Sequence, residues 1–487
     1  MTMELDFTQP PPIAKTLQEA QEIINALWGF CRTLSARADE QQKEIELLKE
    51  KLNTNSKNSS KPPSSDKFKK KTMVKKKSKR KQGGQPGHKG AFRELLPEAE
   101  VDHIEKHRPS KRCDCGSGIR LTGNCRRHQV YELPQVKAVV TEYQLYTGVC
   151  FGCGKIHQSE LPVGVPKGML GPEAMAKIAA LTGDYRISKR NVTFLFEDFY
   201  GLKISIGTVS NTEKRVSEAL KVPVEEAKGF VPSQAAVNAD ETSHAEQSKK
   251  MWTWVFIASL VATFIIRPSR GAQVVKDFLG ETFNGVLSTD RWSAYTWLAV
   301  IFRQLCWAHL RRDFQKISER SGASGRIGEE LLAYTKRMFQ CWHKVKDGTL
   351  SREKFTKVMV PIKARVELLF LEGKSCRNKK TAGTCKQLLK LKEALWTFIE
   401  KEGIEPTNNL AEQIIRRIVI WRKTSFGTQS PRGTLYLERI MTTVSTCKLQ
   451  QRNVLSFVTE AIRAHLNNTP APSLLPKTNE SRSLKVA

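Results

Sequence analysis

Three carboxylates, Asp240, Asp290 and Glu412, have residue types and settings that suit phosphodiester chemistry. Such chemistry needs divalent ions, held by clustered carboxylate oxygens, that activate the attacking oxygen and stabilise the leaving one. Each carboxylate also has a purely structural interpretation. Asp290 would cap a following helix, and Glu412 would pair with Arg416 one turn further on. Glu241, next to Asp240, is an alternative ligand.

The elements around these residues predict how they meet. Strands are expected at 236–243, 252–259, 261–266 and 285–289, with a helix at 272–279 before the last strand. Three strands, a crossover helix and a fourth strand are the order of a ribonuclease-H-like core, in which the first and fourth strands lie side by side. Asp240 and Asp290 would then face each other. Glu412 would lie near the start of a helix whose buried face carries Leu410, Ala411, Ile414, Ile415 and Ile418.

The charge of the chain indicates a polyanionic partner. Against 49 acidic residues stand 80 Lys and Arg, a formal net charge of +31. Twelve of these cations lie between residues 57 and 81, where they would bind phosphates by counterion release; the candidates are Lys69, Lys70, Lys71, Lys75, Lys76, Lys77 and Arg80. The apolar run 251–266 is too short for a membrane span and predicts two buried strands.

The order of modules follows from composition. A heptad pattern predicts a coiled coil at 13–53 and hence a homo-oligomer, although one docked amphipathic helix would look similar. The expected modules after it are a disordered basic tether at 54–90, a zinc-binding-like module at 91–165, a helical domain at 166–230, core segments at 231–317 and 403–465 around a helical insertion at 318–402, and a disordered tail at 466–487. Eleven cysteines without a secretory pattern at residues 1–12 predict a reduced, bacterial cytoplasmic location.

Two cysteine pairs, Cys113-x-Cys115 and Cys150-x-x-Cys153, would close one tetrahedral zinc site. The first pair is one residue tighter than the usual knuckle. Other residues could therefore serve as ligands, namely Cys125, His128 and His157. Unligated thiols are the alternative.

The helical domain contains a candidate helix-turn-helix. Ser188 would cap a helix that ends before Gly201, and a second helix would begin near Ser205. That second helix would present Thr208, Asn211 and Lys214 to the major groove of DNA. A plain helical hairpin has the same pattern.

Four motifs then carry a family resemblance. They are Val237-Asn-Ala-Asp-Glu-Thr242, Ser288-Thr-Asp-Arg-Trp-Ser-Ala-Tyr295, Cys306-Trp-Ala-His-Leu-Arg-Arg-Asp-Phe314 and Asn408-Asn-Leu-Ala-Glu412. With the tether (55–66), the glycine-rich stretch (83–90), the cysteine knuckles and the segment 446–453, they resemble the insertion sequence 66 family of transposases over nearly the whole chain.

The resemblance implies a DDE-type transposase with Asp240, Asp290 and Glu412 as catalytic ligands of two Mg²⁺ or Mn²⁺ ions. Its substrates would be the terminal inverted repeats of the element and target DNA, and accessory proteins of the same element are further candidate partners. His309 and Arg416 are candidates for active-site support. Gln413 replaces an Arg common in the family, which weakens one phosphate contact. The alternatives are a zinc-containing DNA-binding regulator without catalysis and a nuclease that cuts without joining.

Overall fold

The computed structural model describes residues 13–59, 94–122 and 125–476. These residues belong to two units, the first composed of Met1–Lys67, Tyr143–Val192 and Ser205–Ala487 and the second of Phe68–Glu142 and Thr193–Ile204. All three candidate carboxylates belong to the first unit. Among the helices described, none is both long and apolar enough to cross a membrane.

A mixed five-stranded sheet is the centre of the first unit. Its strands are β3 (Ala236–Glu246), β4 (Lys249–Ala258), β5 (Val261–Arg267), β6 (Val286–Thr289) and β7 (Arg303–Leu305), in the order β5-β4-β3-β6-β7. β3, β4 and β5 are antiparallel, whereas β6 is parallel to both β3 and β7. The predicted adjacency of the first and fourth strands is confirmed. The sequence did not predict β7, because three residues are too few to show a strand period.

The two faces of the sheet carry different helices. On one face, α12 (Asn409–Ser425) packs on β3 and β4, and His244 stacks on Trp421 with ring centroids 6.3 Å apart. On the other face lies α6 (Ala272–Leu279), after which the sheet continues into β6. Phe278 of α6 stacks on Phe256 of β4 at 4.1 Å. Side chains of β3 therefore alternate between α12 and the α6 side.

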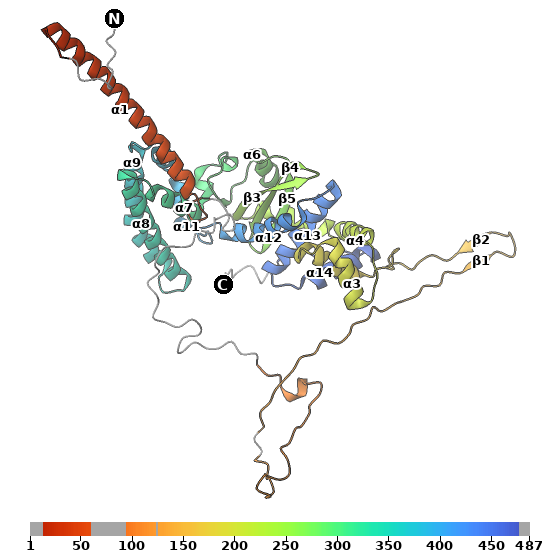
Figure 1. Cartoon of the computed structure of the whole chain (residues 1–487). Helices are drawn as coiled ribbons and strands as arrows, with labels where there is room; N and C mark the ends of the chain where they lie inside the picture. Colours follow the sequence, from red (N-terminus) through yellow and green to blue (C-terminus); the bar gives the residue numbers. More distant parts are fainter. Residues whose placement is uncertain (1–12, 60–93, 123–124, 477–487) are drawn as a thin grey trace. The chain divides into compact units, whose positions relative to one another are not determined.

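Helix α13 (Pro431–Leu449) covers the free edge of β5 with side-chain hydrogen bonds. Three residues one turn apart accept backbone N–H groups of this strand. Glu438 accepts Ile266 at 2.6 Å, Thr442 accepts Phe264 at 3.0 Å and Thr446 accepts Ala262 at 3.1 Å. All three acceptors are buried. The edge strand thus has its outward N–H groups satisfied without a further strand. Figure 1 shows β3, β4 and β5 of this unit with helices α12 and α13 beside them.

Removing one of these acceptors will destabilise the fold. In Thr442→Val the buried N–H of Phe264 loses its partner, and we expect the free energy of unfolding to fall by about 1–3 kcal/mol. Thr443→Val is the matched control, because Thr443 is equally buried and, among the described residues, its hydroxyl donates to the carbonyl of Arg439 within the same helix. Urea unfolding followed by circular dichroism measures both. Equal midpoints for the two variants would contradict the edge-covering role.

A helical bundle in the first unit precedes and follows the sheet in the chain. It contains α2 (Pro172–Ala179), the π-helical turn Ala180–Asp184, α4 (Ile206–Ala219), α5 (Lys221–Phe230) and α14 (Val454–Asn467). α4 packs against α2, α13 and α14. α3 (Lys189–Tyr200) begins in the first unit and continues in the second. The short 3₁₀ turn Val231–Ser233 leads from α5 into β3, and the turns Ser293–Tyr295 and Val300–Phe302 lie between β6 and β7.

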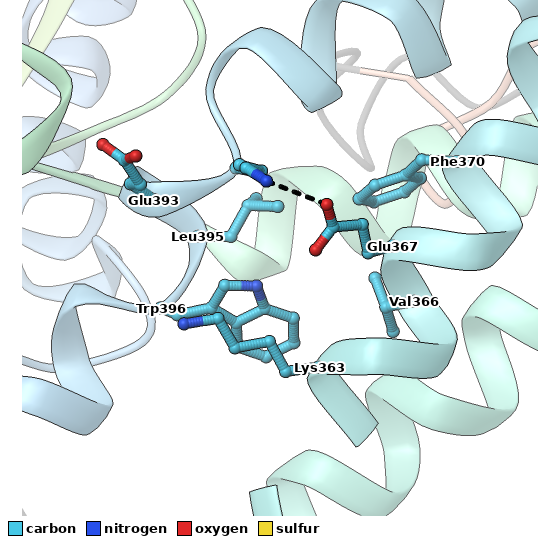
Figure 2. A pocket seen from close by; sticks show the side chains of 8 residues that line it. Lys363, Val366, Glu367, Phe370, Glu393, Leu395 and Trp396 are labelled. Atoms are coloured by element: carbon cyan, nitrogen blue, oxygen red, sulfur yellow. Dashed lines mark hydrogen bonds and ion pairs between the residues drawn. The ribbon is translucent and has the colours of Figure 1, made fainter. Parts of the chain in front are cut away.

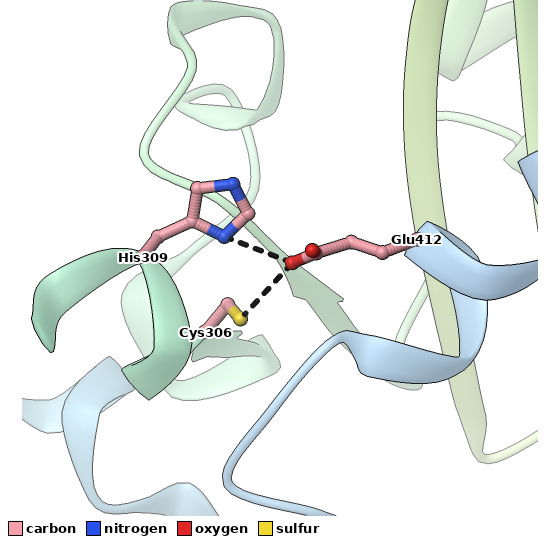
Figure 3. Close-up of side chains that lie close together, drawn as sticks. All are labelled: Cys306, His309 and Glu412. Carbon is pink, nitrogen blue, oxygen red and sulfur yellow. Dashed lines mark hydrogen bonds and ion pairs between the residues drawn. The ribbon is translucent and has the colours of Figure 1, made fainter. Parts of the chain in front are cut away.

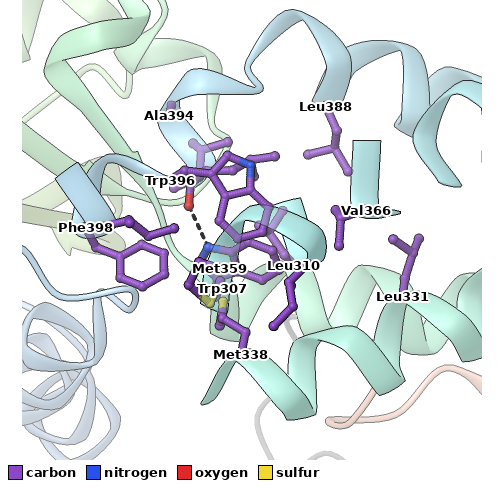
Figure 4. Packing of buried hydrophobic residues seen from close by; sticks show 14 of the residues in the cluster. Trp307, Leu310, Leu331, Met338, Met359, Val366, Leu388, Ala394, Trp396 and Phe398 are labelled. Atoms are coloured by element: carbon purple, nitrogen blue, oxygen red, sulfur yellow. Dashed lines mark hydrogen bonds between the residues drawn. The ribbon is translucent and has the colours of Figure 1, made fainter. Parts of the chain in front are cut away.

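The segment after β7 is helical from Trp307 on, so its helices begin before the insertion predicted at 318–402. It comprises α7 (Trp307–Ser318), α8 (Gly322–Lys346), α9 (Arg352–Lys374), α10 (Lys379–Lys390), the 3₁₀ turn Glu393–Leu395 and α11 (Thr397–Glu400). Figure 4 shows its core around Trp307, whose indole N–H donates to the carbonyl of Leu395 at 2.7 Å. A pocket bridged by the Lys392–Glu367 ion pair opens between α9 and the turn that follows α10 (Figure 2). None of the candidate site residues lines it.

Helix α1 (Leu17–Asn53) exposes the side chains of its heptad, including Ile24 at 57% and Leu34 at 47%. The coiled coil therefore stays a prediction. The predicted tether starts too early, because Asn58 is buried and its amide donates to Glu319 at 2.6 Å. Glu50, in the last turn of α1, pairs with Arg320 at 3.2 Å. These polar contacts order the chain up to residue 59 without any apolar residue.

The predicted disordered tail also starts too early. Helix α14 ends at Asn467, and Leu474 beyond it is fully buried. The carbonyl of Leu474 accepts the Gln450 side chain at 2.7 Å, and that of Ser473 accepts Arg452 at 2.8 Å. The buried side chain of Leu474 and these two hydrogen bonds thus hold residues 468–476 in place. So few contacts leave no recognisable pattern in the Pro-rich sequence.

Candidate active site

Asp240 and Asp290 lie at corresponding positions of two neighbouring parallel strands. β3 and β6 pair through Asn238 and Ser288, and Asp240 and Asp290 each follow two residues later. Both carboxylates therefore lie on the same side of the β3–β6 pairing, beyond its carboxyl end. Asp290 stands directly after β6, and its Oδ1 accepts the N–H of Trp292 at 2.8 Å. This bond closes a local turn after β6, whereas the turn Ser293–Tyr295 has Trp292 at its N-cap and no side-chain capping bond, so the capping alternative considered for Asp290 is wrong.

Glu241 faces the other side of β3 and is already paired with a cation. Its Oε1 accepts two bonds from the guanidinium of Arg270, at 2.7 and 2.9 Å, and Oε2 accepts the hydroxyl of Tyr295. The Arg270 guanidinium lies 3.8 Å from the ring centroid of Trp292 and 4.8 Å from that of Trp252. An Arg held between two aromatic rings is a fixed counterion. This pairing favours Asp240 over Glu241 as a metal ligand.

Glu412 lies in the first turn of α12 and points toward the start of α7. Its Oε1 is 3.3 Å from Nδ1 of His309 and 3.8 Å from Sγ of Cys306, and its Oε2 is 3.5 Å from Arg312 (Figure 3). In the described part of the chain Glu412 makes no ion pair with Arg416, which is exposed to solvent. The helix-internal pairing considered for Glu412 is therefore wrong, because α7 supplies nearer partners.

Asn408 fixes where α12 begins. Its buried amide donates to the carbonyl of Ala239 at 2.7 Å and accepts the Asn238 amide at 2.9 Å, both from β3. Its backbone N–H donates to Sγ of Cys306 at 3.2 Å. One residue thus ties the helix of Glu412 to the strand of Asp240 and to the first residues of α7.

Acidic side chains cluster at this end of the sheet and shift the pKa values of their neighbours. Burial raises the pKa of Asp240 well above its ordinary value, and the negative charges of Glu241, Asp290 and Glu412 add to the increase. The pKa of His309 is lowered by burial, so its imidazole is neutral at neutral pH. Burial raises the pKa of the Cys306 thiol to about 11. Clustered carboxylates that repel one another are suited to a divalent cation, which would remove the repulsion.

The three carboxylates do not form the tightest ligand cluster. Among the described residues, the group of three or more His, Cys, Asp or Glu whose ligand atoms all lie within 4.8 Å of one another is Cys306, His309 and Glu412. Asp240 and Asp290 are thus near Glu412 electrostatically but outside that group. As a catalytic metal set, Asp240, Asp290 and Glu412 stay a prediction.

The cysteine pairs each form a tight turn. Cys150 accepts the N–H of Gly154 through its carbonyl at 2.8 Å, between strands β1 (Thr147–Val149) and β2 (Ile156–Gln158). N–H groups of Gly152 and Cys153 lower the pKa of the Cys150 thiol. Hydrogen bonds from Ser117 likewise lower that of Cys115. Cys113 and Cys115 lie in the second unit and Cys150 and Cys153 in the first, so one zinc site stays a prediction.

The helix caps expected in the helical domain are confirmed. Ser188 accepts the N–H of Asn191 at 3.2 Å, Gly201 has a φ of +64° after α3, and Ser205 caps α4 by accepting Thr208 N–H at 3.0 Å. Asn211 and Lys214 are exposed on α4 and Thr208 is half-buried. DNA binding by these three residues stays a prediction. The basic candidates between Lys69 and Arg80 lie outside the described residues.

Sequence reasoning missed several residues of this site. Arg312 stands in the Cys306–Phe314 motif, but only the packing of α7 on α12 shows that it reaches Glu412. Burial lowers the pKa of Arg303 in β7, and the negative charge of Asp290 partly offsets this decrease. Arg270 had no local signal, because its partners Glu241 and Trp292 come from other elements.

Comparison with known proteins gives the class. Residues 167–435 match a family of transposases, and residues 9–94 match a family of unknown function (DUF6444). The first match covers more than half of the chain, and the chain belongs to the Transposase IS66 family. Membership implies an enzyme that handles DNA with divalent metal ions.

Similar proteins occur in Sinorhizobium fredii and are uncharacterized. Protein y4qI is 28% identical over 273 residues, which are 49% of this chain and 49% of that protein. Protein y4hP is 21% identical over 407 residues, 74% of this chain and 72% of that protein. The match thus spans about half the length of y4qI.

Proposed function

We propose that the chain is a DNA transposase that cleaves the ends of an insertion sequence and joins the resulting 3′-hydroxyls to target DNA. The observation that carries the proposal is the corresponding placement of Asp240 and Asp290 on the paired central strands β3 and β6, with the charge of Glu412 within reach. The strand order β5-β4-β3-β6-β7 supports a ribonuclease-H-like core. Membership of the Transposase IS66 family supports the reaction.

The carboxylates would hold two Mg²⁺ or Mn²⁺ ions. Hard oxygen donors with mutual repulsion are the donor set that such ions favour. When bound, the ions supply the positive charge that activates the attacking oxygen and stabilises the leaving oxygen. Asp240 and Asp290 would bind from the sheet, and Glu412 would complete the set from α12. Water attacks first, and the exposed 3′-hydroxyl attacks in the second step, so no covalent protein intermediate is needed.

The surrounding cations have a distinct role in the proposal. Arg312 lies beside Glu412, and Arg291 pairs with Asp313 at 2.6 Å and with Gln387 at 2.7 Å. Guanidinium groups near the carboxylates would bind the phosphates on either side of the scissile bond. The Glu241–Arg270–Trp292 contacts would hold the segment after β6, and with it Asp290, in place.

The test uses purified full-length protein with labelled DNA that carries the inverted repeats flanking its gene. We expect cleavage and joining in Mg²⁺ or Mn²⁺ and neither in the presence of chelator. Asp290→Ala should abolish both reactions while DNA binding, measured by mobility shift, persists. Joined products separate a transposase from a nuclease. Unchanged turnover in Asp290→Ala would refute the assignment, and DNA binding without any cleavage would favour the regulator.

A further inference from the structure

The start of α7 and the start of α12 bring together a thiol, an imidazole and a carboxylate. Cys306 precedes α7, His309 lies in its first turn, and Glu412 lies in the first turn of α12. Figure 3 shows all three side chains directed at one point. Their ligand atoms lie within 4.8 Å of one another, with Oε1 of Glu412 closest to both partners.

This donor set differs from that of the sheet carboxylates. Mg²⁺ takes oxygen ligands, whereas a thiolate with an imidazole and a carboxylate suits Zn²⁺, Co²⁺ and similar transition ions. Three protein ligands would leave at least one position of a tetrahedral ion open. An ion bound here would therefore be chemically distinct from ions bound by Asp240 and Asp290.

The protein around the cluster favours metal binding over simple packing. Nδ1 of His309 is buried and has no hydrogen-bond partner among the described residues, although it lies 3.3 Å from Oε1 of Glu412. Sγ of Cys306 accepts the N–H of Asn408, a contact that stabilises a thiolate. Cys385 and Cys447 are equally buried thiols, and neither belongs to such a cluster in the described part of the chain. A buried ring nitrogen that lies beside a thiol and a carboxylate is well placed to bind a metal ion.

We propose that Cys306 Sγ, His309 Nδ1 and Glu412 Oε1 bind one transition-metal ion of the Zn²⁺ class. On binding, the S–H bond of Cys306 breaks, its proton passes to solvent and an S–metal bond forms. Because Glu412 is shared, the bound ion would hold its Oε1 away from the Asp240 and Asp290 set. Resting on the proposed function, this site would make strand cleavage sensitive to inhibition by Zn²⁺.

Cobalt titration tests the site directly. Full-length protein, stripped of metal by chelator and kept reduced, is titrated with Co²⁺, and thiolate-to-cobalt charge-transfer absorption is recorded. We expect Cys306→Ser to lose absorption equivalent to one ion. Cys385→Ser is the matched control, since it removes another buried thiol of the same helical segment and should titrate as wild type. The difference between the two variants removes any contribution of Cys113, Cys115, Cys150 and Cys153.

A second variant keeps the test valid if Cys306→Ser does not fold. His309→Gln retains the thiol, and we expect its Co²⁺ affinity to fall at least about tenfold. Identical titrations of wild type, Cys306→Ser and His309→Gln would overturn the proposal. These spectra need no DNA, so they stand even if the protein cleaves none. In the cleavage assay, the Zn²⁺ concentration for half inhibition should rise at least about tenfold in His309→Gln relative to its own uninhibited rate.

Discussion

Asp240→Asn is expected to lower the rate of strand cleavage at least about a thousandfold, because losing one of the three proposed metal ligands would remove several kcal/mol of transition-state stabilisation. DNA binding should persist, since the substitution lies in the sheet and removes one negative charge. Cleavage of labelled element ends, measured in single turnover with saturating Mg²⁺, gives the rate. Asp277→Asn, which alters an exposed carboxylate on α6, is the control and should cleave as wild type.

In the absence of metal, Asp240→Asn should be more stable than the wild type. The pKa of Asp240 in the folded protein lies well above 3.8, so its ionised form destabilises the fold. This penalty is absent below pH 3.8, grows as the pH rises toward the folded pKa and is complete above it. Metal-free Asp240→Asn should therefore melt at a higher temperature at pH 7, with the difference vanishing near pH 4. Added Mg²⁺ should stabilise only the wild type. Equal melting temperatures of the metal-free wild type and Asp240→Asn at pH 7 would contradict the conclusion that ionised Asp240 destabilises the fold.

Asn408→Ala is expected to reduce cleavage about a hundredfold without altering a metal ligand, because small displacements of a catalytic group have effects of that size. The side chain makes two buried hydrogen bonds to β3, so the free energy of unfolding should also fall by about 2–4 kcal/mol. Its exposed neighbour provides the control, and Asn409→Ala should change neither quantity.

The assay separates positioning from stability. Cleavage by Asn408→Ala is measured well below its melting temperature, with the DNA dissociation constant determined alongside. A slower chemical step with unchanged DNA affinity is the expected result. If stability falls while the cleavage rate stays that of the wild type, Asn408 holds the fold together but does not position Glu412.

The sequence by itself determined the local elements. Alternating or continuous apolar runs predicted β3 to β6, the helix at 272–279 and the buried face of α12, because these periods depend only on neighbouring residues. Helix caps also depend only on neighbouring residues. The residue types at Ser188, Gly201 and Ser205 were therefore enough to predict where the two helices begin and end. The neighbourhood of the first and fourth strands followed from the expected topology once the elements were known, and β3 does lie beside β6.

Only the tertiary structure decided which polar groups meet. Both Asp240 and Glu241 are acids on one strand, and their roles diverge because Arg270 and Tyr295 occupy one face while α12 occupies the other. Glu412 pairs with His309 and Arg312, about a hundred residues away, rather than with its helical neighbour. Such contacts depend on how whole helices pack against one another, and the apolar periodicity of a single segment carries no information about that packing. The sequence alone therefore sets the identities of Asp240, Asp290 and Glu412, whereas the fold sets which groups they contact.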